Sequence, residues 1–315
     1  MRLEYNKEEL LQRSRKKVSL PDELTSELAY LVGALRDGCI SGTSTQEGIK
    51  EYVAWCSKSR EFLEKVIIPL LSKVFIIDKP KIKPDRDKFQ VRVHIHSIVQ
   101  FFKKVFSHPG GKQNDWDIPP VILASTREIK RSFIQGFFDA EGGSGNVEKL
   151  RYKYPWQSSF PLRIWSASIN HSKCFQLEKL KELLEEFGIH SHVKKVKSSS
   201  NKTKLPIFCL TIKNSQDKLL FITSISSRHP EKIKQLHTLK NLIKRSTKAE
   251  SDNKCVTAYP PRVSALKMEG TKLGTDTLDC ASSGRGASCM DRSLCVSRGG
   301  PCRNEDPAES SNIAG

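Results

Sequence analysis

Two segments of one design constrain what this chain can fold into more than any other feature of its sequence. Residues 28–38 and 133–143 are each an apolar helical stretch followed by an acid and then by glycine. Glycine there suits the end of a helix, because it adopts the left-handed conformation without strain. The acids Asp37 and Glu141 then lie at the C-terminal end of a helix dipole, which repels negative charge. An unfavourable arrangement that occurs twice predicts a cation between the two acids, and a divalent metal is the obvious candidate.

The second segment closely resembles the motif of the LAGLIDADG homing endonucleases. Gly136, Asp139, Ala140, Glu141 and Gly142 fall at the family's glycine, aspartate, alanine, acid and glycine. Two such segments in one chain are typical of the monomeric, two-motif members that archaeal introns encode.

The first segment departs from that motif. Gly33 precedes Asp37 by four residues where the family usually has five, and bulky Arg36 occupies the small position before the acid. Because Ala29, Gly33 and Asp37 share one helical stripe, close packing in a shifted phase is the alternative that we carry forward.

The resemblance covers roughly residues 20 to 245 and includes the stretches 56–70, 162–165 and 180–189. It implies an α+β fold of two pseudo-symmetric αββαββα-like halves, whose antiparallel sheets form a DNA-binding saddle and whose motif helices form the interface. We expect a lead-in over 1–22, a first half over 23–122, a second half over 123–250 and a low-order tail over 251–315.

The pattern of apolar residues repeats one order of elements in both halves. Helical spacing predicts helices over 26–36, 59–73, 126–141, 172–187, 217–226 and 230–245. Alternation predicts strands over 51–55 and 163–168, and hairpins over 79–96 and 190–213. After residue 254 no sustained period remains, and five cysteines there match no common zinc spacing.

The net charge of +18 is the footprint of a nucleic-acid binder. Residues 255–315 hold seven basic and seven acidic residues, so the whole excess lies before them. No apolar run approaches the ~20 residues that span a bilayer, and the N-terminus lacks a signal-peptide pattern. We therefore expect a soluble, cytoplasmic protein of a prokaryote, and the resemblance points to an archaeon.

If the motif helices pack side by side, Asp37 and Glu141 meet at one end of the interface, where two close carboxylates need a cation. The predicted ligands are these two side chains with Gly38 and Gly142, and the metal is Mg²⁺, with Mn²⁺ as an alternative. The resemblance also places Lys58 near the scissile phosphate or the attacking water, so Asp37, Glu141 and Lys58 are the catalytic candidates. The competing interpretation is a pair of capping or solvated acids. Asp139 is expected to be structural, since it points to another face.

We expect the outward-facing side chains of the strands to contact DNA, Arg, Gln and His addressing base edges and Lys mostly phosphate. In the first half these are Lys79, Lys81, Lys83, Arg86, Lys88, Gln90, Arg92 and His94. In the second half they are Lys153, Arg163, Lys194, Lys195, Lys197, Lys202, Lys204 and Lys213.

The resemblance implies a monomeric, site-specific, metal-dependent endonuclease that hydrolyses one phosphodiester in each strand of a long asymmetric site in double-stranded DNA. Two alternatives of other classes stay open. One is an RNA maturase, whose partner would be intron RNA; the other is a DNA-binding regulator of the same fold with an inactive site. Both acids are present, which argues against the inactive regulator but leaves the maturase open.

Overall fold

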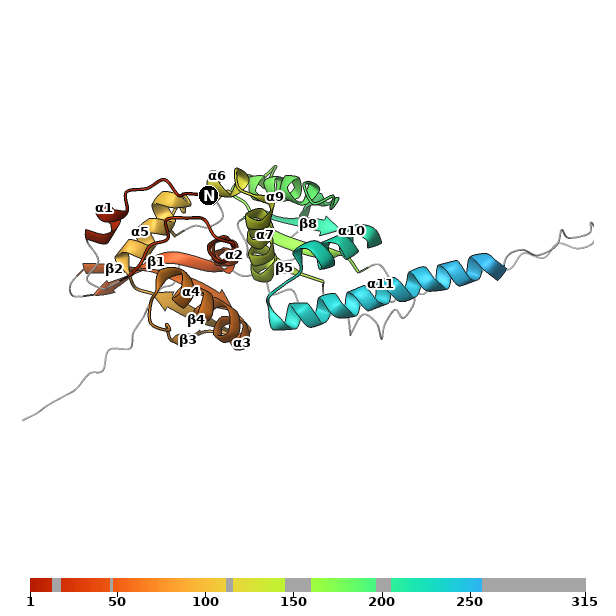
Figure 1. Ribbon diagram of the computed structural model, residues 1–315, viewed down its shortest axis with the longest axis horizontal. Coiled ribbons are helices and arrows are strands. Elements are labelled where there is room, and N and C mark those ends of the chain that lie inside the picture. The colour runs from red at the N-terminus through yellow and green to blue at the C-terminus, as the bar shows by residue number, and fades with distance from the viewer. Residues whose placement is uncertain (13–17, 46–47, 112–115, 145–159, 197–204, 257–315) are drawn as a thin grey trace, which may run out of the picture. The chain divides into compact units, whose positions relative to one another are not determined.

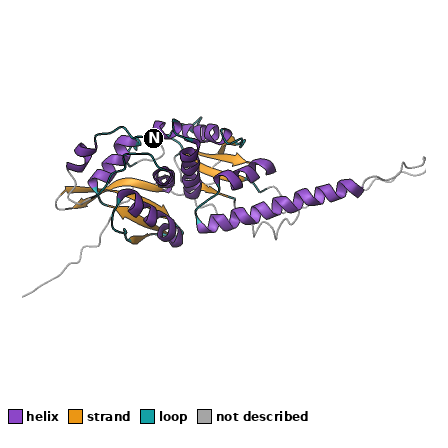
Figure 2. Cartoon of the chain, viewed as in Figure 1, coloured by secondary structure: helices purple, strands orange, loops and turns teal. Residues whose placement is uncertain are grey.

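A computed structural model describes residues 1–12, 18–45, 48–111, 116–144, 160–196 and 205–256 of the chain (Figure 1). Helices and antiparallel strands alternate through these residues (Figure 2). None of the described helices combines the length and the apolar composition needed to cross a bilayer.

The first half of the chain builds one four-stranded antiparallel sheet. Its elements are α1 (Lys7–Gln12), α2 (Ser26–Ala34), the 3-10 turn η1 (Leu35–Asp37), β1 (Gly38–Thr45), β2 (Gly48–Ser57), α3 (Arg60–Phe62), the π-helical turn η2 (Leu63–Ile67), α4 (Ile68–Phe75), β3 (Ile82–Asp85), β4 (Lys88–Val93) and α5 (His96–Val105). The strand order is β1-β2-β4-β3.

The second half repeats this plan with a sheet of order β5-β6-β8-β7. Its elements are α6 (Pro120–Leu123), α7 (Arg127–Glu141), β5 (Gly142–Gly143), β6 (Leu162–Ala167), α9 (Phe175–Glu185), β7 (His192–Val196), β8 (Ile207–Ile212), α10 (Ser215–Leu220), the π-helical turn η4 (Phe221–Ile225) and α11 (Pro230–Val256). Residues 1–246 belong to one compact unit, and α11 from Thr247 onward to a second. Two αββαββα-like halves with antiparallel sheets confirm the predicted α+β fold.

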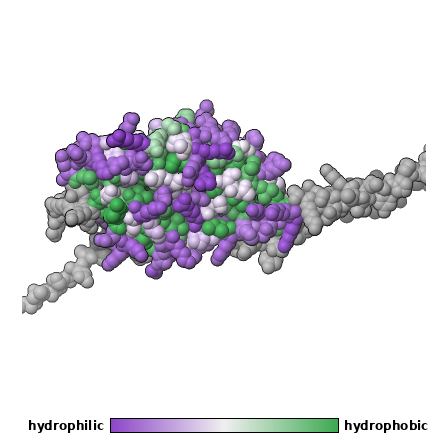
Figure 3. Space-filling model, viewed as in Figure 1, coloured by the Kyte–Doolittle hydropathy of each residue, from purple (hydrophilic) through white to green (hydrophobic). Residues whose placement is uncertain are grey.

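One face of each sheet packs on helices. Trp55 of β2 donates a hydrogen bond from its indole to the Leu31 carbonyl of α2, 3.0 Å away, and meets Phe102 of α5 edge to face. In the second half Ile164 and Leu210 are fully buried together with Leu180 of α9. Outside this core, hydrophilic side chains line the upper and lower margins of the face in Figure 3, with hydrophobic patches between them.

The helices α2 and α7 cross at two glycines. A Cβ on Gly33 would lie 2.8 Å from the Phe137 nitrogen and closer still to the Phe133 carbonyl oxygen, and a Cβ on Gly136 would lie 2.9 Å from the Ala34 nitrogen. The two backbones therefore touch directly, as the small residues of both motifs predict.

Several predicted boundaries are wrong. The strand β1 was not predicted, and β2 is longer than the expected 51–55. Residues 94–96 do not continue β4, because α5 begins at His96, where burial of Ile98, Phe101 and Phe102 favours a helix. The last helix runs to Val256 rather than to residue 245.

The lead-in over 1–22 places apolar side chains in the core. Leu3, Leu10 and Leu20 are buried in the same core as α2. The N-terminal residues therefore contribute to the packing of the first half.

Candidate active site

The two acids follow the crossing helices at matching heights. From Gly136 to Glu141 the chain takes five α-helical steps, which rise about 7.5 Å in total. From Gly33 to Asp37 it takes only four, but three of them lie in the 3-10 turn η1. Since a 3-10 helix rises about 2.0 Å per residue, these four steps also cover about 7.5 Å. The overwound turn thus compensates along the helix axis for the residue that the first motif lacks.

The glycines after the acids are required for space rather than for a left-handed backbone. Gly38 has φ −123° and Gly142 has φ −96°, so both are extended, and the predicted left-handed helix ends are wrong. A Cβ on Gly38 would clash with the Ala54 carbonyl of β2, and one on Gly142 with the ring of Phe138. Each glycine instead lets a strand leave the helix end immediately.

Asp37 is held by a lysine from the neighbouring strand. The Lys88 Nζ atom lies 2.8 Å from Asp37 Oδ1, and only about a fifth of each side chain is exposed. Burial raises the pKa of Asp37, while the charge of Lys88 and its hydrogen bond act in the opposite direction. A cation therefore already balances this acid.

Glu141 is more strongly perturbed. Burial, together with the nearby charge of Asp37, raises the pKa of Glu141 to about 8, and Lys88, Lys232 and Arg36 oppose the rise. The negative charge of Asp37 thus raises the pKa of Glu141, as the sequence predicts for acids that meet at one end of the helix pair.

The donor set fits a hard divalent cation. Two half-buried acids with raised pKa values lie at the ends of the two crossing helices, and an ammonium group occupies the position of a counter-ion beside one of them. Among the described residues no group of three or more His, Cys, Asp or Glu side chains could hold a metal. A site here would therefore need backbone carbonyls or water beside the two acids.

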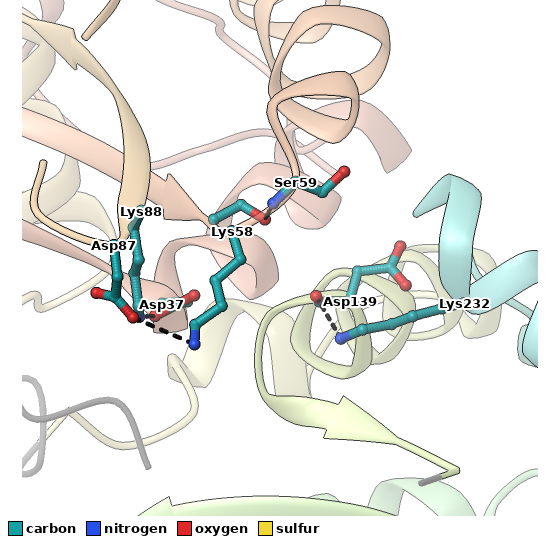
Figure 4. A network of polar contacts seen from close by, with 8 residues as sticks. Asp37, Lys58, Ser59, Asp87, Lys88, Asp139 and Lys232 are labelled. Atoms are coloured by element: carbon teal, nitrogen blue, oxygen red, sulfur yellow. Dashed lines mark hydrogen bonds and ion pairs between the residues drawn. The ribbon is translucent and has the colours of Figure 1, made fainter. Parts of the chain in front are cut away.

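Lys58 lies in the same cluster but is paired with another acid. Its Nζ atom is 3.2 Å from Asp87 Oδ2, in the turn before β4, and about half of its side chain is exposed (Figure 4). Ser57 is buried, and its hydroxyl accepts a hydrogen bond from the Ser59 nitrogen at 3.1 Å. Ser57 is thus engaged in starting α3.

Asp139 anchors the motif helix, as its expected structural role implies. Its buried carboxylate accepts hydrogen bonds from the Tyr30 hydroxyl of α2 at 2.6 Å, from the Arg228 nitrogen at 2.8 Å and from the Ser227 hydroxyl. Tyr30 and Asp139 therefore tie the two motif helices together below the acids.

Arg36, bulky where the family motif is small, donates its hydrogen bonds to backbone carbonyls. Its buried guanidinium donates to the carbonyls of Trp116 and Asp117, the second at 2.9 Å, and lies 4.3 Å from the centroid of the Trp116 ring. Asp117 in turn pairs with Lys179 of α9. Arg36 thus fastens the segment that joins the halves.

The face of the first sheet that does not pack on helices, together with the turns beside it, carries part of the predicted DNA-contacting set. Lys83 and His94 are exposed, and Arg92 lies half-buried with its guanidinium 4.8 Å from the Tyr52 ring centroid. Lys79 and Lys81 are exposed but precede β3, and Arg86 is exposed in the turn. Two members differ from the expectation. Gln90 is only 2% exposed, and Lys88 is bound to Asp37.

The second sheet presents a shorter set. Arg163 and Lys194 are exposed and lie on the same face, because their register partners Thr211 and Cys209 are two residues apart on β8. Lys213 is exposed just beyond that strand. Lys195 is also exposed, but it lies opposite the core residue Phe208 and donates to the His171 carbonyl at 2.8 Å. Lys153, Lys197, Lys202 and Lys204 lie outside the described residues.

Sequence reasoning missed Lys232 of α11. Its Nζ atom donates to the carbonyls of Phe138 and Asp139, at 2.9 and 2.6 Å, at the end of α7 (Figure 4). The only signal in the sequence was a lysine in the first turn of a helix otherwise chosen for its apolar stripe.

Comparisons with known proteins agree with the motif. Residues 128–229 match the family model of a LAGLIDADG-like domain, so this part of the chain is such a domain and the predicted family is confirmed for it. The homing endonuclease I-ApeI of Aeropyrum pernix is 29% identical over 118 residues, which are 36% of this chain and 51% of that protein. The chain thus spans about half the length of this curated relative.

Solved structures of two homing endonucleases are partly similar. I-DmoI in complex with DNA and Mn has a TM-score of 0.47 and 20% identity, and the match covers 66% of this chain and 99% of that one. I-WcaI bound to its DNA recognition sequence has a TM-score of 0.43 and 14% identity, over 72% and 97% of the two chains. These scores mark a partial likeness, and the fold described above rests on its own strands and helices.

Proposed function

We propose that this chain, whose residues 128–229 form a LAGLIDADG-like domain, is a site-specific double-strand DNA endonuclease that uses a divalent metal. The observation that carries the proposal is the pair of half-buried acids Asp37 and Glu141 at the ends of two helices that touch backbone to backbone. Two non-identical halves, one acid from each, suit a reaction that hydrolyses one phosphodiester in each strand.

Asp37 and Glu141 would hold the metal, with carbonyl oxygens of Gly38 and Gly142 as further ligands. When bound, Mg²⁺ or Mn²⁺ activates water and stabilises the charge that develops on a phosphodiester. The chain itself holds both acids half-buried at the helix ends and places the charge of Lys88 beside Asp37.

Lys58 would act on one of the two DNA strands. Its half-exposed ammonium group lies beside the acid cluster, on the turn between β2 and α3, where it can orient a phosphate or a water molecule by hydrogen bonds. Its pairing with Asp87 holds the side chain toward the acids rather than away from them.

The polar faces of the two sheets would bind the DNA backbone and bases. Exposed cations on strands and turns of both halves, among them Lys83, Arg86, Arg163 and Lys194, can neutralise phosphates over a long, asymmetric site. Arg92 and His94 are the candidates for base contacts in the first half. We further propose that the protein works as a monomer, with residues 23–122 and 123–250 as its two halves, in the cytoplasm of its host.

The test uses circular DNA in which the sequences flanking the reading frame are joined, so that the intron is removed. The wild-type protein with Mg²⁺ should linearise this DNA at one site and leave short 3′ overhangs. A double variant, Asp37→Asn with Glu141→Gln, is the matched control and should bind the same DNA without cutting it.

Two other outcomes would replace the proposal. Specific binding of the wild-type protein without cleavage would identify a DNA-binding regulator. Binding to the intron RNA that promotes its splicing, without any cut in the DNA, would identify a maturase.

A further inference from the structure

The helix α11 lies outside the family domain but is built into its catalytic end. The match to the LAGLIDADG-like domain ends at residue 229, and α11 begins at Pro230. Leu236, Leu239 and Ile243 bury one stripe of α11 in the core. The helix is therefore firmly seated, and its first turn lies where α7 ends.

The end of α7 and the start of α11 bind each other reciprocally. The carboxylate of Asp139 accepts hydrogen bonds from the Arg228 nitrogen and the Ser227 hydroxyl, just before α11. In return, Lys232 donates to the carbonyls of Phe138 and Asp139. The Phe138 carbonyl already accepts the Gly142 N–H, but carbonyls of the last turn such as that of Asp139 have no partner within the helix. The two bonds from Lys232 therefore hold a turn that would otherwise fray more easily.

Charge favours the same arrangement. The C-terminal end of a helix dipole is negative, and Asp139 and Glu141 both lie in the last turn of α7. The charges of Asp139, Glu141 and Asp37 all act on Lys232, and its ammonium lies 5.5 Å from the centroid of the Phe138 ring. Lys232 thus adds a second positive charge near Glu141, beside that of Lys88.

We propose that Lys232 is a positioning residue for Glu141, which holds the last turn of α7 so that this carboxylate points into the site. The proposal rests on the proposed function and adds to it a residue beyond the matched range 128–229. Because the hydrogen bonds described for Lys232 go to the end of α7, its loss should impair the half of the reaction that depends on Glu141 more than the half that depends on Asp37.

The experiment compares full-length Lys232→Met, Lys232→Arg and Lys234→Met with the wild type. Lys234 is the matched control, because it is an exposed lysine on the same helix. Cleavage of each strand is followed separately on end-labelled target DNA with Mg²⁺. Residues that orient a ligating group typically contribute about 10–100-fold to activity, so Lys232→Met should slow one strand by that factor and leave the other within about threefold.

The arginine variant keeps the charge and the donors and should restore most of the lost rate. The strand slowed by Lys232→Met should be the one most affected by Glu141→Gln. Equal slowing of both strands, no slowing, or the same effect in Lys234→Met would overturn the positioning role.

A second measurement does not depend on cleavage. Hydrogen exchange at the end of α7, including the Gly142 N–H that bonds the Phe138 carbonyl, should accelerate at least about tenfold in Lys232→Met and stay unchanged in α2. If the wild type does not cut DNA but this local loosening is seen, the proposed nuclease function fails while the anchoring by Lys232 stands. If exchange is unaffected, the anchoring itself is wrong.

Discussion

Gly33 of α2 and Gly136 of α7 lie opposite each other where the two helices touch backbone to backbone. Replacing either glycine by alanine should destabilise the protein, because the new methyl group would meet main-chain atoms that cannot move aside. Overpacking of this kind typically costs about 1–3 kcal/mol. Urea unfolding of Gly33→Ala and Gly136→Ala measures it.

The sign of the change is decisive. In a helix without such a contact, alanine is more favourable than glycine by about 0.8–1.0 kcal/mol. An increase in the free energy of unfolding for either variant would show that the helices do not approach as closely as described.

Single substitutions of the acids should separate binding from cleavage. Asp37→Asn and Glu141→Gln keep the shape of each side chain but remove the charge that attracts a metal. Each should abolish double-strand cleavage while specific DNA binding stays largely intact. Gel-shift and cleavage assays on the same target measure both properties, and wild-type rates on both strands in either variant would remove that acid from the site.

Metal binding should depend on pH in a direction fixed by Glu141. Its pKa of about 8 means that the free protein holds a proton there at neutral pH, and a metal must displace it. With one proton released, the affinity for Mn²⁺ should rise about tenfold per pH unit between pH 6 and 8. Calorimetric titration at three pH values checks this, and an affinity independent of pH would exclude Glu141 as a ligand.

Stability should respond in the opposite sense. A carboxyl group with a raised pKa binds a proton in the folded state that the unfolded chain has released, so its contribution falls as pH rises from the usual value of 4.5 through about 8. His108 and His229, whose pKa values are lowered by burial to about 3 and 4, contribute stability that rises with pH up to about 6.5. The free energy of unfolding is therefore compared between the wild type and Glu141→Gln at each pH. The variant should not lose the stability that the wild type loses between pH 4.5 and 8, and saturating Mg²⁺ should reduce that loss in the wild type.

Which parts of this molecule were predictable follows from how local the signals are. The motif helices were predictable because each carries an apolar stripe, a small residue and an acid within a few turns. The height of Asp37 was not, because it depends on the 3-10 turn η1, and a helix shortened by one residue gives no sign of how it is overwound.

Long-range contacts account for the remaining differences. The strand alternation placed Gln90 and Arg92 on the face away from the core, but it could not show that Gln90 is covered there. Lys88 was predicted to contact DNA as one cation among many, and its pairing with Asp37 depends on how β4 lies beside the end of η1. Lys232 is separated from the carbonyls it binds by 93 and 94 residues, so no local pattern could identify it.

DNA binding should weaken steeply with salt. Exposed cations of both sheets would displace counterions that are condensed on the DNA. Six to ten phosphate contacts imply a loss on the order of 10³–10⁵ in affinity between 50 and 200 mM salt. Fluorescence anisotropy with labelled target DNA measures the slope, and an affinity that does not change with ionic strength would contradict binding along the DNA backbone.

Deletion of residues 257–315 should leave a folded and active protein. Among the described residues, the last buried hydrophobic side chain is that of Ile243, and residues 255–315 contribute none of the net charge. A second truncation, which ends at His229 and removes α11, is the contrasting variant. It loses Leu236 and Leu239 from the core together with Lys232, so it should unfold or lose cleavage. Thermal melts and cleavage assays compare the two. If the shorter deletion alone abolished cutting while the protein stayed folded, the four cysteines that it removes would belong to a working part of the enzyme, as a metal site or a DNA-contacting arm.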